Sequence, residues 1–168
     1  MTVDEVLADG FSRVHEVVHE VVRGLSADQL SYRPHPAANS IGWLIWHLTR
    51  VQDDHVADVA GTEQAWLAEG WSGRFGLPFD DQATGWGHSA HDVGAFQVAS
   101  SELLTGYHDA VYARTLAFVR TVTESDLDRV VDTRWDPPVT LGVRLVSVID
   151  DDAQHAGQAA YVRGLIVD

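Results

Sequence analysis

The chain has 168 residues, enough for one domain with a full core but short for two. Its 25 acidic residues outnumber the 11 basic ones, and a formal net charge of −14 disfavours nucleic acid as a partner. No apolar run approaches the roughly 20 residues that span a bilayer, and the acidic N-terminus lacks the apolar stretch of a signal peptide. We therefore expect a cytoplasmic protein with no membrane partner. Cysteine is absent, so any thiol chemistry would need a thiol supplied from outside.

The first half of the chain shows two helical patterns. Apolar residues at helical spacing predict a first helix over residues 2–25. Pro34 and Pro36 break the pattern. Helix-forming residues then predict a second helix over 40–60, which closes at Gly61.

Residues 62–90 differ from the rest of the chain because they are rich in glycine and aromatic residues. We expect a short helix around 63–69 followed by a long ordered loop. Loops of this length in compact domains are often functional, so this segment is a candidate lid. Several of its side chains, together with two tryptophans of the second helix, are secondary candidates for lining a pocket: Trp43, Trp46, Trp71, Trp86, His88 and His91.

The second half predicts two more long helices. The pattern favours a third helix over 91–122, which Pro137 and Pro138 prevent from continuing, and a last helix over 141–165. We see no strand-like alternation. These observations predict an all-α protein, an up-down-type four-helix bundle in one domain over 1–168, with a long connection between helices two and three. Apolar bundle faces also favour a homodimer.

The first predicted helix contains His15-Glu16-Val17-Val18-His19, which matches the H-E-x-x-H pattern of zinc proteases. A catalytic zinc helix buries both imidazoles in a cleft and finds a third ligand elsewhere in the chain. Here the apolar stripe of the helix places His15 on its flank and His19 toward solvent. We therefore interpret this match as a surface feature, with His15 at an interhelix edge and Glu16 on the wet face.

A second group of residues has the chemistry of a metal site. His47 lies in the most apolar helix, and Asp151 and His155 are four residues apart on the last helix, so both project from one face. Two imidazoles and one carboxylate form a common catalytic zinc set with an open position, and iron or nickel accepts a similar set. Spacing alone leaves the alternative that residues 150–152 form a solvated acidic edge and that both histidines are core residues.

The residues NSIGWLIWHLTRVQDDHVADVAG and DDDAQHAGQAAYVRGL resemble the DinB-like superfamily of four-helix bundles over about residues 4–166. The most specific elements are the WHL histidine and the C-terminal HxGQ motif with a ligand four residues earlier. This resemblance implies a divalent metal, zinc first, held by His47, Asp151 and His155. The set is more similar to that of mycothiol-dependent maleylpyruvate isomerase than to the three-histidine set of other members. Asp is shorter than the usual ligand here, so Asp152 is an alternative.

The resemblance also implies an activity. Members of the superfamily include metal-dependent transferases of low-molecular-weight thiols such as mycothiol, acting on electrophilic small molecules. Three residues are candidates for supporting roles: Arg50 to hold a carboxylate, Asp54 to orient a ligand imidazole, and Gln158 to form hydrogen bonds. A salt bridge of Arg50 with Asp53 or Asp54 is the alternative. Two other functions stay open, a metal-dependent hydrolase and a non-enzymatic stress-related metal-binding or scaffold protein.

Overall fold

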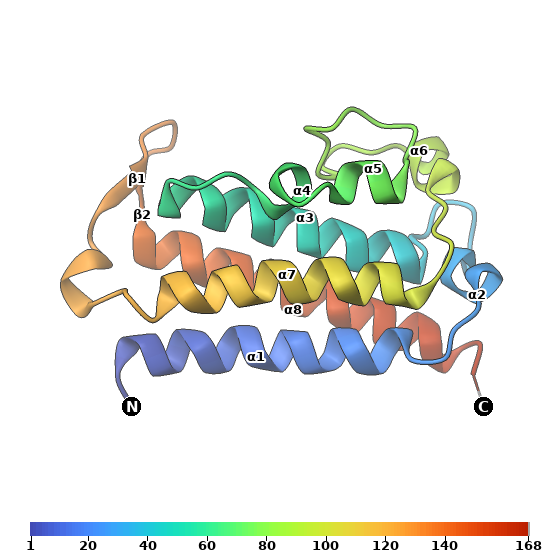
Figure 1. The fold of residues 1–168 in the computed structure, drawn as a ribbon, viewed down its shortest axis with the longest axis horizontal. Helices are drawn as coiled ribbons and strands as arrows, with labels where there is room; N and C mark the ends of the chain where they lie inside the picture. Colours follow the sequence, from blue (N-terminus) through green and yellow to red (C-terminus); the bar gives the residue numbers. More distant parts are fainter. Residues whose placement is uncertain (168) are drawn as a thin grey trace.

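The computed structural model describes residues 1–167 and is 63% helical, which confirms the all-α class (Figure 1). In chain order the elements are α1 (Val3–Val22), α2 (Ala27–Ser31), α3 (Ile41–Ala60), α4 (Ala65–Ala68), α5 (Trp71–Phe75), α6 (Ala90–Ala95), α7 (Ser101–Val119), η1 (Glu124–Asp126), β1 (Val130–Asp132), β2 (Val139–Thr140) and α8 (Leu141–Gly164). Within residues 1–167, no helix is long and apolar enough to cross a membrane.

The four long helices α1, α3, α7 and α8 lie side by side, and each packs mainly against two of the others. α1 and α3 both pack against α7 and α8 and barely touch one another, so they lie on a diagonal. Figure 1 shows α1 and α8 running in one direction and α3 and α7 in the other. The four long helices therefore do not alternate strictly in direction, since α3 and α7 run the same way. The reason is that the connection 61–100 brings the chain back to the end of the molecule where α3 begins.

The apolar stripe predicted for the first helix forms its buried face. Leu7, Phe11, Val14 and Val18 recur every three or four residues and are all almost fully buried. Burying each such side chain stabilises the fold by about 1.5–3 kcal/mol. The helix begins at a capping box in which Thr2 and Glu5 exchange hydrogen bonds across the first turn.

The predicted third helix over 91–122 is in fact two helices, because residues 96–100 are not helical. α6 ends before Phe96, and α7 begins only after Ser100. The intervening segment is irregular because Phe96 and Val98 pack closely on Gly42 of α3, where a Cβ atom would lie 3.1–3.2 Å from both side chains. Tertiary packing therefore overrides the local helical pattern.

The expectation of no strands is also wrong. β1 and β2 pair antiparallel between η1 and α8. These strands are too short to produce a readable alternation of polar and apolar residues. The buried carboxylate of Asp132 fixes the hairpin, since it accepts hydrogen bonds from Arg134 at 2.8–2.9 Å and from Arg144 of α8 at 3.0 Å.

The connection after α3 is held against the long helices by buried polar contacts. Asp53 accepts hydrogen bonds from the backbone N–H groups of Ala65 and Trp66 at 2.9 and 2.8 Å, and from the Tyr107 hydroxyl at 2.8 Å. The short helix expected around 63–69 corresponds to α4. The further short helices α2 and α5 were not expected from the sequence.

Candidate metal centre

Three side chains from the two helices α3 and α8 converge. His47, Asp151 and His155 each offer a ligand atom, and these atoms all lie within 4.8 Å of one another. The imidazole rings of the two histidines meet edge to face, with centroids 4.7 Å apart. The His47 residue is buried, whereas the side chains of His155 and Asp151 are 18% and 38% exposed. The cluster therefore lies in the seam between α3 and α8, open to solvent on one side.

The ring of His47 is held in one orientation. Its Nδ1 atom lies 2.6 Å from the carbonyl oxygen of Thr84, and because a carbonyl only accepts, Nδ1 carries the proton. Trp43 stacks on the same ring at 4.6 Å. Burial lowers the pKa of His47, so the imidazole is neutral near pH 7 and the lone pair of Nε2 is free to bind a metal.

Asp151 and His155 are coupled on α8. The Nδ1–H of His155 donates to the backbone carbonyl of Asp151 at 2.8 Å, which again leaves Nε2 free. The Asp151 carboxylate is 3.4 Å from the same Nδ1, an ion-pair separation rather than a good hydrogen bond. Partial burial alone would raise the pKa of Asp151, but the adjacent His155 lowers it overall, so the carboxylate is ionised. Its Oδ2 atom is buried and lacks a hydrogen-bond partner within residues 1–167, as expected of an atom placed to ligate.

The side chain of Asp152 is not part of the cluster. It is fully buried, and neither carboxylate oxygen has a hydrogen-bond partner in the part of the chain that the structure describes. Burial, and then the nearby charge of Asp151, raise the pKa of Asp152 well above its ordinary value. The carboxylate that accompanies the two imidazoles is thus that of Asp151.

The segment over His47 approaches so closely that it requires glycine. At Gly85 the backbone has φ +93°, and a Cβ atom would lie 2.6 Å from Nδ1 of His47 and 3.0 Å from Trp43. Both the left-handed conformation and the contact exclude other residues. The connection 61–90 thus supplies a wall of the cluster, although a closing motion of this segment stays a prediction.

Two of the three supporting candidates form hydrogen bonds with the connection after α3, and the third is exposed. Arg50 is fully buried and donates to the carbonyl of Ala83 at 3.1 Å and to Gln64 at 2.7 Å, so its guanidinium binds the connection rather than facing a substrate. Asp54 accepts from Gln64 at 2.8 Å, and the Nδ1 proton of His47 goes to Thr84 instead. Gln158 is exposed, one turn beyond His155.

Of the secondary candidates, the structure brings His88 close to the cluster. Its Nδ1 atom accepts a hydrogen bond from the Trp43 indole at 3.2 Å. Trp46 and Trp71 belong to the apolar core, whereas Trp86 is 89% exposed and the side chain of His91 is 92% exposed. Trp46 and Trp71 therefore pack the apolar core.

His55 is not among the site residues predicted from the sequence. It lies two helical turns after His47 on α3, and its Nδ1 atom accepts from Arg144 at 3.3 Å. Burial and then Arg144 lower its pKa, and the carboxylates of Asp54, Asp58 and Asp151 act in the opposite direction. The spacing of two full turns from His47 was the available signal.

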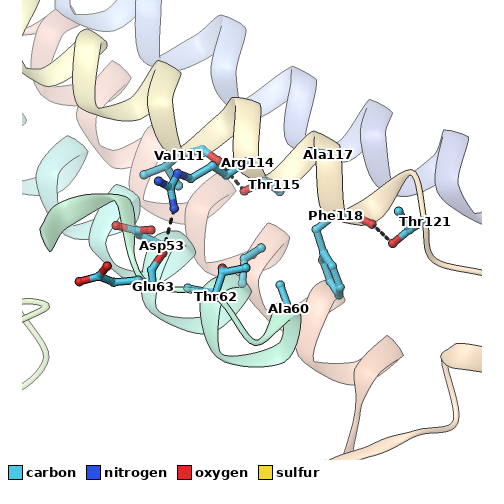
Figure 2. A pocket seen from close by; sticks show the side chains of 12 residues that line it. Asp53, Ala60, Thr62, Glu63, Val111, Arg114, Thr115, Ala117, Phe118 and Thr121 are labelled. Atoms are coloured by element: carbon cyan, nitrogen blue, oxygen red, sulfur yellow. Dashed lines mark hydrogen bonds between the residues drawn. The ribbon is translucent and has the colours of Figure 1, made fainter. Parts of the chain in front are cut away.

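Two of the hollows along the long helices concern the site. One, of about 620 Å³, is lined by the 34–39 loop, by Leu44, which precedes His47 by one turn, and by Gln158, which follows His155 by one turn. The other, of about 310 Å³, lies between α3 and α7, where Arg114 donates to the Glu63 carbonyl (Figure 2). Its floor is apolar, and its one buried carboxylate, Asp53, already accepts three hydrogen bonds. The first hollow is the better candidate for a ligand of the cluster.

The cluster fits a divalent metal. Two imidazoles that present Nε2, and one carboxylate with a buried oxygen free of hydrogen bonds, match the ligands that zinc, nickel and iron accept, and the exposed side of the seam leaves a position open.

The chain is similar to known proteins over nearly its whole length. Residues 6–167 match the family model described as Mycothiol-S-transferase. A crystal structure of a conserved protein from Enterococcus faecalis is similar to this chain, with a TM-score of 0.92 and 33% sequence identity. The similarity covers 99% of this chain and 98% of that one. No curated protein matches the chain.

Proposed function

Because this chain belongs to the mycothiol S-transferase family, we propose that it transfers a low-molecular-weight thiol, such as mycothiol, to an electrophilic small molecule. His47, Asp151 and His155 would hold the divalent metal, zinc first, that this reaction requires. The observation that carries the proposal is the convergence of these three donors. A hollow of about 620 Å³ begins one turn away along both helices, at Leu44 and Gln158.

A metal held there would lower the pKa of the thiol, which would favour its thiolate form near neutral pH. The chain has no cysteine, so the sulfur comes from the external thiol. In the transfer, the thiol loses its proton to solvent, a carbon–sulfur bond forms, and the leaving group of the electrophile departs with its bonding electron pair.

The residues of the chain orient and shield this site. Thr84 fixes His47, and the carbonyl of Asp151 fixes His155, so both imidazoles present Nε2 without further reorganisation. Trp43 covers one face of His47 and keeps water from it. Preorganised ligands of this kind lower the reorganisation required during the reaction.

The hollow of about 620 Å³ suits the thiol. Its wall combines the apolar side chains of Leu44 and Tyr161 with the amides of Asn39 and Gln158. Amides both donate and accept hydrogen bonds, as the hydroxyl groups of a sugar-bearing thiol require. We assign Gln158 to the binding of the thiol rather than to the metal.

Metal-dependent hydrolysis at the same cluster is less well supported, because it needs a base beside the bound water. The further imidazoles near the cluster are those of His55 and His88, and their Nδ1 lone pairs accept hydrogen bonds from Arg144 and Trp43.

The test is the rate at which the zinc-loaded protein joins mycothiol to a fluorogenic electrophile such as monochlorobimane. We expect His155→Ala to lower the rate by about 100-fold or more, because the metal loses a ligand. His91→Ala and Glu16→Gln, which change exposed residues away from the seam, should keep the rate. Equal rates in the His155→Ala variant and the unaltered protein would contradict the proposal.

A further inference from the structure

The two histidines of the H-E-x-x-H stretch of α1 contact the neighbouring helix α7. The Nε2 atoms of His15 and His19 both point to one oxygen, Oδ1 of Asp109 on α7, at 2.8 and 2.6 Å. The two imidazole centroids are 4.6 Å apart. The expectation that His19 is merely solvated is therefore wrong, because its imidazole, like that of His15, forms a hydrogen bond with a carboxylate of the neighbouring helix.

The ligand atoms of His15, His19 and Asp109 all lie within 4.8 Å of one another. This is the same chemical set, two imidazoles and a carboxylate, as in the seam of α3 and α8. It lies in the seam of α1 and α7, which is the opposite edge of the helix array. No residue is shared between the two clusters, so the second cluster needs its own explanation.

The first imidazole of the pair is held in place by its surroundings. Tyr112 stacks on His15 with centroids 4.1 Å apart, and its hydroxyl is fixed by Ser12 at 2.7 Å. His108, which is fully buried, stacks at 5.6 Å on the same ring. Side chains supported in this way bind a metal with little loss of conformational entropy.

We propose that His15, His19 and Asp109 form a second site for a divalent transition metal of the zinc, nickel or copper class. Imidazole nitrogens are good ligands for these metals, and two histidines four residues apart on a helix can bind one ion together. Tetrahedral zinc with bonds of roughly 2.0–2.1 Å places its ligand atoms about 3.3 Å apart. The side chain of Asp109 is 50% exposed, so it can shift outward by the few tenths of an ångström that this requires.

The site is a binding site rather than the centre of a protease. Glu16, which would act as the base in a zinc protease, is exposed.

The test is calorimetric titration of the metal-free full-length chain with zinc chloride. We expect two equivalents for the unaltered protein and one equivalent for the His47→Ala/His155→Ala variant. Adding Asp109→Asn or His19→Ala to that double variant should abolish the remaining binding, whereas adding His91→Ala, an exposed histidine beside an aspartate, should not. Asp109→Asn keeps the shape of the side chain and His19 is partly exposed, so both variants should fold, which circular dichroism checks.

Two results would overturn the second site. One is the absence of zinc binding by the His47→Ala/His155→Ala variant while it remains folded. The other is retention of that equivalent after Asp109→Asn and after His19→Ala, since the zinc would then be bound elsewhere. A protein that binds one equivalent, lost with Asp109→Asn alone, would support this site and contradict the metal centre at His47.

Discussion

The Nδ1 atom of His47 donates to the carbonyl oxygen of Thr84, 2.6 Å away, although 37 residues separate them. This contact joins the cluster of His47, Asp151 and His155 to the connection between α3 and α7. It exists because Gly85 lets the backbone lie against the imidazole and Trp43. The long connection therefore contributes to the site through its backbone.

Gly85→Ala should weaken zinc binding at this cluster by about 10–100-fold, as loss of a partner that orients a ligand histidine typically does. The new Cβ would lie 2.6 Å from Nδ1 of His47 and push the segment away. The affinity can be measured by competition with a chelator in an Asp109→Asn background. Gly87→Ala is the matched control, because Gly87 also has positive φ, +76°, but has nothing within 4 Å of an added Cβ. Equal losses in both variants would show that backbone strain alone is responsible.

Arg50→Ala should lower the free energy of unfolding by about 3–5 kcal/mol, because it leaves buried polar partners unsatisfied. The Arg50 guanidinium is fully buried and binds Gln64, Tyr107 and the carbonyl of Ala83. Urea denaturation measures the change.

For comparison, Arg74→Ala removes an exposed guanidinium that lies 4.4 Å over Trp71, and it should lower the free energy by only about 0.5–1 kcal/mol. If the two variants lose the same stability, Arg50 does not anchor the connection.

Asp132→Asn should change how stability depends on pH. Hydrogen bonds from Arg134 hold the pKa of Asp132 well below its ordinary value. A carboxyl group with a lowered pKa in the folded state stabilises the protein above its unfolded pKa of about 3.9, and this contribution is lost as the pH falls further. The variant should therefore have a lower melting temperature than the unaltered protein near neutral pH, and the difference should shrink below about pH 4.

Asp128→Asn changes an exposed carboxylate and should follow the unaltered protein at every pH. A difference between Asp132→Asn and the unaltered protein that stays constant down to the lowest pH would contradict this role of the ion pair.

Most of the fold could be predicted because the long helices carry strong periodic signals. The buried stripe of α1 and the boundaries of α3 and α8 follow from apolar spacing and from capping residues. The resemblance to the DinB-like superfamily is confirmed, since the matched family belongs to it. The hairpin and the end of α6 could not be predicted, because short strands carry little pattern and the turn at Phe96 depends on its contact with Gly42.

The candidate site was only partly visible in the sequence. The spacing of Asp151 and His155 on one helix predicts that they share a face, and the structure places His47 beside them. The roles of Thr84 and Gly85 depend on backbone atoms that come close only in the folded chain. The homodimer and the cytoplasmic location stay predictions.

The most direct test of the central claim is the absorption spectrum of the cobalt-substituted Asp109→Asn protein when mycothiol is added. A thiolate bound to cobalt produces an intense sulfur-to-metal charge-transfer band in the near ultraviolet. We predict that this band appears on addition of mycothiol and is absent when His155→Ala is also introduced. Absence of the band in the protein with His47, Asp151 and His155 intact, or its persistence after His155→Ala, would contradict thiol activation at this centre.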